Sequence, residues 1–553
     1  MKKISLFFIL CIAAFTVKAQ LFINNATFQI QTGATVIVQG DVTSNVDILG
    51  PGKVLLGGSA NQNITMNGFT IPNLEINNAA NATLLTNARI GSSMLFTNGK
   101  IIQGNFDMKI ADVATITGGA AGKYFQISGT GQLIKELSAN ATAYELPVGE
   151  GTNYRPAYLT SSGTYTAAQF GVRVLAGSDA NKPPMIASYL NTNWPVTKSG
   201  ITGTASLSGQ YIDPTDVSGT ESNLVGYFKS GTDWSSIGET HNAATNQVGA
   251  LVTAATGVVS GLNKFLAVGT RAFLQGSYVA GTGLMTDALR TLPFGPASSN
   301  ANFPQDDPYR QALYSAAFPH VNNVAIETIP NAAVLDQAGT NDDIVDWVFL
   351  QLRNLAASPG NTIQQTRSAL IQRDGDIVDI DGVSPVTFNG LAGLVDGNYI
   401  ITVRHRNHLG LSYVQSAPKP LTESSSLAFT PAKVFDLRTE AQGNLFGLAA
   451  AHTTLAHPTL GNGTPNTVNV LWGGNANFNG NVRFSALSND RDFILVTTLS
   501  NNPLTVISPI YSPADVNMNK VVRWSALNND RDFLLINALG NNPLNVRTQA
   551  IPN

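Results

Sequence analysis

The chain is poor in cysteine and in charge. Its 553 residues include one cysteine, and 12% of them are charged, roughly half of the usual share of about 25%. With so little cysteine, a disulfide framework, a thiolate metal site and a cysteine nucleophile are excluded. The formal net charge of −3 excludes the strongly basic surface by which proteins bind nucleic acid.

Long hydrophobic runs are also missing, with one exception at the N-terminus. Lys2 and Lys3 precede an apolar stretch, residues 4–17, which ends in a small-x-small cleavage signal at residues 17–19. The stretch is too short to cross a bilayer and contains the single cysteine. We therefore expect a signal peptide over residues 1–19, secretion to the extracellular space or the outer cell surface, no membrane span and a mature chain without cysteine.

The chain is instead rich in Gly, Asn, Thr and Val, which predicts a mainly β, multi-domain protein. Between residues 20 and 122, short apolar runs such as 36–38 and 54–56 alternate with turn sequences such as Gly57-Gly58. Two architectures fit this module, a β-solenoid or a sandwich of short strands. In a solenoid, the Asn-rich turns would stack as ladders, because an amide both donates and accepts hydrogen bonds.

Longer strands follow in the middle of the chain. Residues 123–270 predict an immunoglobulin-like β-sandwich whose core is anchored by Trp194 and Trp234, although the cysteine pair of true immunoglobulin domains is missing. Residues 271–425 predict a second β-sandwich with a short helix near residues 307–318.

Within this second sandwich, the strand over residues 344–350 would direct Asp346 outward. Asp374-Gly375-Asp376 indicates a hairpin between strands. The loop-rich residues 426–470 are expected to be a linker.

The C-terminal residues 471–553 contain an internal repeat of forty residues. The sequence Asn-Asp-Arg-Asp-Phe occurs at 489–493 and again at 529–533, and Asn-Asn-Pro-Leu occurs at 501–504 and again at 541–544. Before each Asn-Asp-Arg-Asp-Phe sequence, oxygen-bearing side chains occupy alternating positions, as they do in a Ca²⁺-binding loop.

The second copy carries Asp515, Asn517 and Asn519 at the first, third and fifth positions of such a loop. The carboxylate normally found at position 12 is replaced by Ala526, so later aspartates must close the site. We therefore predict a candidate Ca²⁺ site in each copy and no other cofactor. The predicted ligands are Asp515, Asn517, Asn519, Asp530 and Asp532 in the second copy, and Asn475, Asn477, Asn479, Asp490 and Asp492 in the first.

The alternative interpretation of these segments needs no metal. The Asn residues then form turns, and Asp–Arg pairs in the two Asn-Asp-Arg-Asp sequences hold the repeats together.

Two other groups of residues carry side chains of the kinds used in catalysis or metal binding. One interpretation of Asp374, Asp376, Asp379 and Asp381 is a glycosidase carboxylate pair, but a solvated turn with outward strand positions is the expected structure. A histidine pair three residues apart, His405 and His408, binds metal when it lies on a helix. Here the pair follows a strand and has no adjacent acidic ligand, so we expect a turn.

Three stretches, residues 342–353, 367–379 and 397–410, resemble a module of large secreted Bacteroidetes proteins described as hemagglutinin-like or adhesin-like. The C-terminal repeats are similar to the segment that follows this module and to dockerin-type Ca²⁺ loops. The resemblance implies an extracellular adhesive or scaffold role, and it supplies no catalytic residue.

The leading functional hypothesis is a non-enzymatic secreted or cell-surface adhesive or scaffold protein whose partners are glycans or a cell-surface protein. No nucleophile elbow, phosphate loop or dinucleotide fingerprint is found, so no catalytic or cofactor-binding residue is predicted. One alternative is a polysaccharide-binding or polysaccharide-active protein, although carboxylates are scattered over residues 20–122. Another is a structural subunit of a filament or surface layer, which predicts self-assembly.

Overall fold

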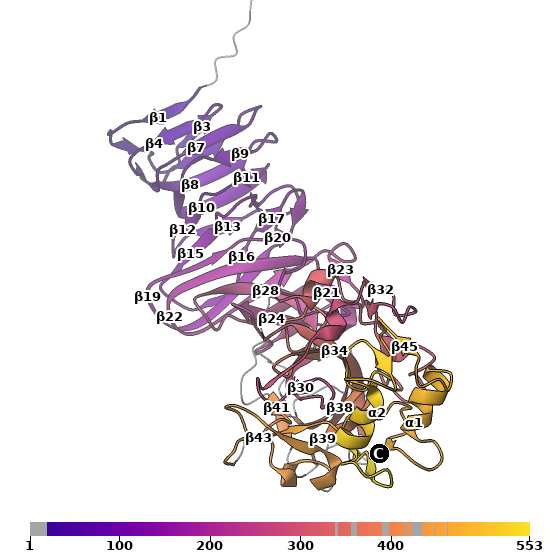
Figure 1. The fold of residues 1–553 in the computed structure, drawn as a ribbon. Coiled ribbons are helices and arrows are strands. Elements are labelled where there is room, and N and C mark those ends of the chain that lie inside the picture. The colour runs from indigo at the N-terminus through magenta and orange to yellow at the C-terminus, as the bar shows by residue number, and fades with distance from the viewer. Residues whose placement is uncertain are drawn as a thin grey trace, which may run out of the picture.

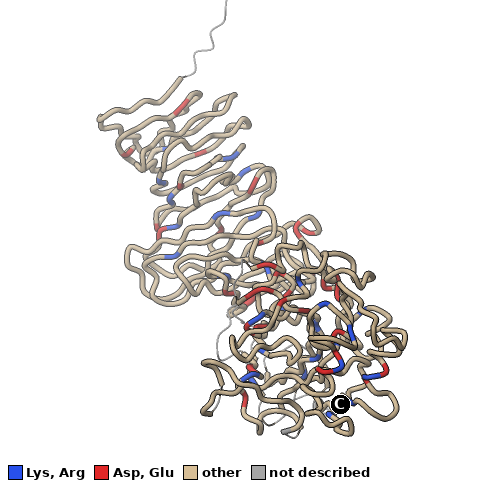
Figure 2. Tube along the Cα trace, in the orientation of Figure 1, with Lys and Arg blue, Asp and Glu red and all other residues tan. Residues whose placement is uncertain are grey.

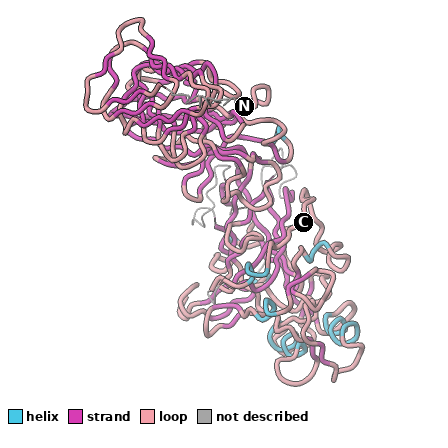
Figure 3. Tube along the Cα trace, turned by 90° about the horizontal axis from the view of Figure 1, so that it is seen from above, coloured by secondary structure: helices cyan, strands magenta, loops and turns pink. Residues whose placement is uncertain are grey.

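The structure is a computed structural model that describes residues 19–337, 341–354, 362–389, 397–414, 416, 418–421, 434–447, 449–461 and 463–552. Residues 1–18, which carry most of the expected signal peptide, lie outside the described residues. With 46% strand and 7% helix, the chain is mainly β, as the sequence predicts. Most of the short helices lie in the half that carries the C-terminus (Figure 3). None of the described helices is long and apolar enough to cross a membrane.

The N-terminal module is a β-solenoid of about six turns, which decides between the two architectures left open by the sequence (Figure 1). Successive coils stack through two parallel sheets. One sheet contains β1 (Leu21–Ile23), β4 (Val42–Ser44), β7 (Gln62–Thr65), β9 (Ala82–Leu84), β11 (Ile101–Ile102), β14 (Phe125–Gln126) and β17 (Val148–Glu150). The other contains β3 (Thr35–Val38), β6 (Lys53–Leu56), β8 (Thr70–Asn77), β10 (Ala88–Asn98), β12 (Met108–Ile110) and β15 (Leu133–Leu137).

The length of a coil varies along the solenoid. Val36 pairs with Val54, eighteen residues further on, whereas Met108 pairs with Leu133, twenty-five residues further on. Apolar side chains still alternate inward on each short strand, because successive residues of a strand point to opposite faces. The variable coil length explains why this module shows no fixed sequence period.

Asn and Asp side chains connect neighbouring coils at the polar corners. Asn45 Nδ2 donates to Asn24 Oδ1 at 2.8 Å. More often an oxygen accepts a backbone N–H of the next coil, as Asn87 Oδ1 does from Asp107 N at 2.9 Å. Amide side chains thus bridge coils, which confirms the predicted stacking, although backbone N–H groups are the more frequent donors.

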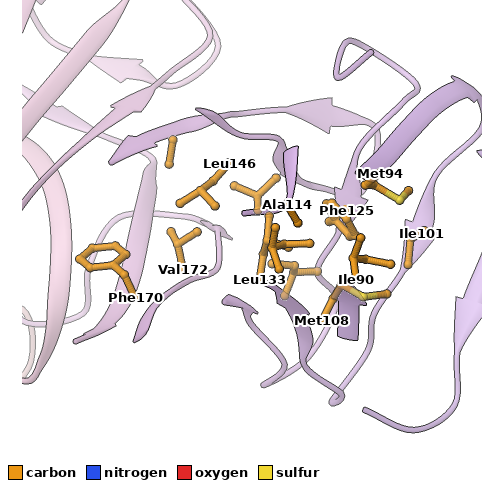
Figure 4. Close-up of a cluster of buried hydrophobic side chains, with 14 of the residues drawn as sticks. Ile90, Met94, Ile101, Met108, Ala114, Phe125, Leu133, Leu146, Phe170 and Val172 are labelled. Atoms are coloured by element: carbon orange, nitrogen blue, oxygen red, sulfur yellow. The ribbon is translucent and has the colours of Figure 1, made fainter. Parts of the chain in front are cut away.

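The solenoid core continues into the antiparallel strands that follow it. The last coil strand, β15, pairs in parallel with β12 on one edge and antiparallel with β19 (Ala157–Val172) on the other. Phe170 and Val172 of β19 are buried beside Leu133 in the same apolar cluster (Figure 4). The edge of the parallel sheet is therefore covered by a strand of the next module, which leaves no open edge there.

The second module consists of long antiparallel strands. They are β16 (Ala141–Leu146), β19, β22 (Thr192–Gln210), β24 (Leu224–Ser230), β27 (Gln247–Leu251) and β28 (Thr256–Asn263). Trp194 and Trp234 are both buried, as expected of core anchors. The immunoglobulin-like type of this module stays a prediction.

The third part is built on a mixed sheet. Its strands are β37 (Val386–Asn389), β29 (Phe265–Arg271), β36 (Asp376–Val378), β35 (Thr362–Gln372), β34 (Ile344–Asn354), β38 (Gly397–His405) and β39 (His408–Ser412). Every residue of β34 is buried, so both faces of this strand are covered. The hairpin expected at Asp374-Gly375-Asp376 joins β35 to β36.

Two segments of this part differ from expectation. The helix expected near residues 307–318 is a 3₁₀ helix over Pro308–Arg310, followed by turns. The residues expected to be a linker pack against the sheet: β41 (Val434–Asp436) pairs in parallel with β29, and Val468 and Val470 are fully buried. In the described part of 426–470, these apolar residues complete the core of the sheet.

Two C-terminal segments, forty residues apart, make the same local contacts. β45 (Val506–Ile507) pairs with β46 (Val522–Arg523), and β44 (Asn481–Arg483) pairs with β47 (Val546–Thr548). Each segment contains a short helix, α1 (Asp490–Asp492) or α2 (Asp530–Asp532), that continues as a π-helical turn. The rings of Phe484 and Trp524 stack, with centroids 6.1 Å apart. Each of these two strand pairs therefore contains one strand from each segment.

Candidate functional site

Two of the predicted Ca²⁺ ligands of the second C-terminal segment, Asp515 and Asp530, are held against the same loop. Asp515 and Asp530 are fully buried. Asp515 accepts hydrogen bonds from the backbone N–H groups of Asn519 at 3.0 Å and of Lys520 at 2.7 Å. Asp530 accepts from the N–H groups of Val516 at 3.0 Å and Arg523 at 2.9 Å. The fold thus holds both carboxylates against one loop.

These carboxylates lie in an environment that opposes their ionisation. Burial raises the pKa of Asp515 to about 7. Burial, and then the charge of Asp515, raises the pKa of Asp530 well above its ordinary value. Backbone N–H donors compensate only in part, since they act against the desolvation of two like charges.

The amides of this segment surround the same loop. The Nδ2 groups of Asn517 and Asn519 donate to the carbonyl of Asn528 at 3.0 and 3.2 Å. Asn517 Oδ1 is buried and has no hydrogen-bond partner among the described residues. No three His, Cys, Asp or Glu side chains gather as a metal site in the described part of the chain, so any cation here needs amide oxygens. Two carboxylates beside an unpartnered amide oxygen form a donor set that suits Ca²⁺.

The first segment repeats the arrangement with one carboxylate fewer. Asp490 is buried and accepts from the N–H groups of Arg483 at 2.9 Å and Asn477 at 3.3 Å. Burial raises its pKa to about 8. Asn477 and Asn479 donate to the carbonyl of Ser488, and Asn475 Oδ1 is buried without a partner among the described residues. Asn475 replaces the second carboxylate, so this site offers a cation less charge.

Asp492 and Asp532 do not join these clusters. Each pairs with the arginine just before it in sequence, Arg491 at 2.8 Å and Arg531 at 2.7 Å. Each also accepts from an asparagine that caps its helix, Asn489 or Asn529. The Asp–Arg pairs lie within each segment, so they do not hold the two segments together.

Asp346 is fully buried, so the expectation that it points outward was wrong. It accepts from Arg406 Nε at 3.0 Å, from His405 Nε2 at 3.0 Å and from Tyr511 Oη at 2.6 Å. Although burial opposes its charge, Arg406 and then His405 hold the pKa of Asp346 below its ordinary value. The network links β34, the turn after β38 and the C-terminal segment (residues 511–515), because Arg406 also donates to the carbonyl of Ser512.

The two histidines flank a turn and do not lie in it as expected: His405 ends β38, His408 begins β39, and Arg406 and Asn407 form the turn. Their hydrogen bonds define their tautomers. His408 Nε2 accepts from Gly276 N at 3.0 Å, so a neutral His408 carries its proton on Nδ1. That nitrogen lies 2.7 Å from Asn407 Oδ1 and 3.0 Å from His405 Nδ1. His405 therefore carries its proton on Nε2, facing Asp346. Both rings are neutral donors and acceptors within a buried network.

The aspartates of the hairpin region make separate structural contacts. Asp379 is buried and pairs with Arg367 at 2.8 Å, and Asp376 pairs with Arg271. Asp381 accepts from Ser384 Oγ at 2.6 Å. Asp374 accepts from the N–H of Asp376 at 3.0 Å. Two of these carboxylates thus bind different arginines, and the other two close turns.

Sequence reasoning missed a pocket of about 380 Å³ beside the second C-terminal segment. Its walls come from two distant parts of the chain, residues 276–286 and residues 517–537. Asn517, Asn519, Asn528 and Asn537 line it, together with the rings of Tyr278 and Phe533. The asparagines stand out in the sequence, but only the fold brings them opposite Tyr278.

We expect Asp346→Ala to lower the free energy of unfolding by about 3–5 kcal/mol, because it leaves Arg406 buried without its counter-ion. Glu239→Ala, which removes the half-buried pair with Lys264, is the control and should cost about 0–1 kcal/mol. Urea unfolding curves of the two variants measure the difference. Equal losses would show that the buried network does not stabilise the fold.

We also expect His405 and His408 to contribute a loss of stability as the pH falls below about 6.5. Burial lowers the pKa of His405, and it lowers the pKa of His408 well below the ordinary value. These two side chains therefore bind more protons in the unfolded chain than in the folded chain below pH 6.5, so their contribution to stability declines. The buried carboxylates, whose pKa is raised in the folded chain, act in the opposite direction. In thermal melts between pH 7.5 and 5, His405→Gln should reduce this decline more than His241→Gln, whose ring is half-buried. Identical pH profiles of the two variants would contradict the inference that His405 is neutral in the folded chain.

Comparison of the chain with protein-family models, with curated proteins and with solved structures found no match.

Proposed function

We propose that this chain is a secreted, non-enzymatic adhesive or scaffold protein in which the β-solenoid is a rigid spacer for the C-terminal half. The observation that carries the proposal is the continuous apolar core from Ile23 to Val259, which joins the solenoid to the antiparallel module. The N-terminal signal sequence and the resemblance to adhesin-like proteins support an extracellular or cell-surface location.

A rigid spacer follows from the way the coils are joined. Each coil is hydrogen-bonded to its neighbours through two sheets and packs one layer of a shared core. Bending such a stack breaks ladder hydrogen bonds and opens the core, and both changes are costly. The extended shape in Figure 1 would hold the C-terminal half away from an attachment point at the other end.

The charge distribution supports contacts with neutral partners. Lys, Arg, Asp and Glu are sparse along the solenoid and more frequent in the C-terminal half (Figure 2). Many of the latter are committed to buried pairs, as in the Asp346–Arg406 and Arg367–Asp379 pairs. Recognition would therefore depend on amide, hydroxyl and aromatic groups, which suits glycans or a polar protein surface.

The function is tested by applying the purified chain, residues 20–553, to a glycan array and to cultured cells, with light scattering to determine its oligomeric state. We expect a monomer that binds a defined set of glycans or cells in a saturable manner. A chain that binds none of them, or that assembles into a regular polymer, would contradict the adhesive role. The polymer would instead favour a structural subunit.

We further propose that the second C-terminal segment binds Ca²⁺ through Asp515, Asn517, Asn519 and Asp530. Bound Ca²⁺ would neutralise two buried carboxylates and provide a partner for Asn517 Oδ1. In an extracellular protein without disulfides, it would also stabilise the loop of the second C-terminal segment. The first segment, with Asn475 in place of the second carboxylate, would bind Ca²⁺ more weakly.

We expect millimolar Ca²⁺ to raise the melting temperature of the full chain and EDTA to reverse the change. Asp530→Asn should abolish most of this response, because it removes one of two carboxylates. Asp490→Asn, the same change in the first segment, is the matched control and should leave most of the response. A wild-type chain whose melting temperature ignores Ca²⁺ would refute the metal proposal.

A further inference from the structure

We propose that the pocket between residues 276–286 and the second C-terminal segment binds a neutral sugar residue. The inference rests on the proposed adhesive function and assigns it a site. The pocket volume of about 380 Å³ lies within the range of small-ligand sites, about 300–1,000 Å³.

The chemistry of the lining matches a sugar. Asn528 and Asn537 are exposed and line the pocket. Their side-chain amides make no hydrogen bond to another residue that the structure describes. Each amide offers two donors and an acceptor in one plane, which complements neighbouring hydroxyl groups. Tyr278 and Phe533 add partly exposed rings to the same lining, against which the C–H face of a sugar packs.

The charge of the lining selects against anionic ligands. The charged side chain of the pocket lining is Asp532, whose Oδ1 accepts from its counter-ion Arg531 and whose Oδ2 accepts from Asn529. His408, which lies behind Gly276, is neutral in this network. A phosphate, a sialic acid or a uronic acid would meet a carboxylate without an unpaired cation, so a neutral sugar is the ligand that fits.

The two walls of the pocket are fixed relative to each other. Gln275 Nε2 donates to the carbonyl of Asn537 at 3.1 Å, and Gly276 N donates to His408. A Cβ on Gly276 would lie 2.3 Å from the carbonyl oxygen of Val516, so only glycine permits this approach. Tyr278 is held by its hydroxyl, which donates to the carbonyl of Ala456 at 2.9 Å. The pocket therefore exists before any ligand binds, which reduces the entropy cost of binding.

The first C-terminal segment provides an internal comparison. Ser488 and Thr497 stand at the positions of Asn528 and Asn537, so this segment lacks both amides. Phe478, at the position of Met518, packs against Tyr314 and Phe493. The two segments share one buried aspartate, Asp490 or Asp530, but differ in the residues that would contact a sugar.

The test uses the full chain, residues 20–553, with Ca²⁺ present, and measures binding of methyl glycosides of neutral hexoses and of sialic acid by NMR saturation transfer and calorimetry. The pocket variant is Asn528→Gly with Asn537→Ala, where glycine is chosen because Asn528 has a φ of 55°. The control variant is Ser488→Gly with Thr497→Ala, since Ser488 has a φ of 54°.

We expect wild type and the control variant to bind at least one neutral hexoside with equal affinity, and the pocket variant to bind it at least ten-fold more weakly. Sialic acid should not bind. If wild type binds glycans on the array but the pocket variant binds them equally well, this site is refuted while the adhesive function stands. If wild type binds no neutral sugar in any format, the site is refuted, and cell binding alone then decides the adhesive function. A control variant that loses binding as much as the pocket variant also refutes the site.

Discussion

Asp346 and Arg406 form a buried ion pair on which the C-terminal half of the structure depends. Arg406 lies in the turn between β38 and β39, and its guanidinium also donates to the carbonyl of Ser512. Next to it, Asn407 donates to the carbonyl of Asp515 at 2.7 Å, and His408 accepts from Gly276. One turn therefore contacts a central strand, the loop that carries the proposed Ca²⁺ ligands and one wall of the pocket. Since a buried charge is costly without its partner, these elements are expected to hold their positions together.

The N-terminal half depends on a different constraint, the completion of backbone hydrogen bonds at sheet edges. Each coil satisfies the next, and β19 covers the edge of the last one. The same contact merges the two cores, because Phe170 and Val172 reach the apolar layer that Leu133 belongs to. The solenoid and the second module are thus joined through one continuous core, which is the property that the proposed spacer requires.

The two candidate sites depend on contacts of different range along the sequence. The buried carboxylates are held by backbone N–H groups of nearby turns, so each C-terminal segment positions them with its own residues. The pocket depends on a contact between segments about 240–260 residues apart in sequence, exemplified by Gln275 and Asn537. A repeat can therefore conserve one buried aspartate in both copies, Asp490 or Asp530, and still differ in the residues at the positions that line the pocket.

Sequence alone was sufficient for features that depend on near neighbours. The alternation of short apolar runs with Gly and Asn turns predicted a mainly β chain, and the structure chose the solenoid from the two architectures that this pattern allows. The 489–493 and 529–533 repeats identified Asp490 and Asp530, which the structure buries at equivalent places in the two segments. Tertiary structure decided the features that depend on distant neighbours. The strand pattern around Asp346 predicts that this side chain points to solvent. In the structure it is buried under a layer that includes Tyr511, which is 165 residues away in sequence. The pocket opposite Tyr278 was equally invisible, because side-chain periodicity reports which face of a strand is apolar but not which distant segment will pack against it.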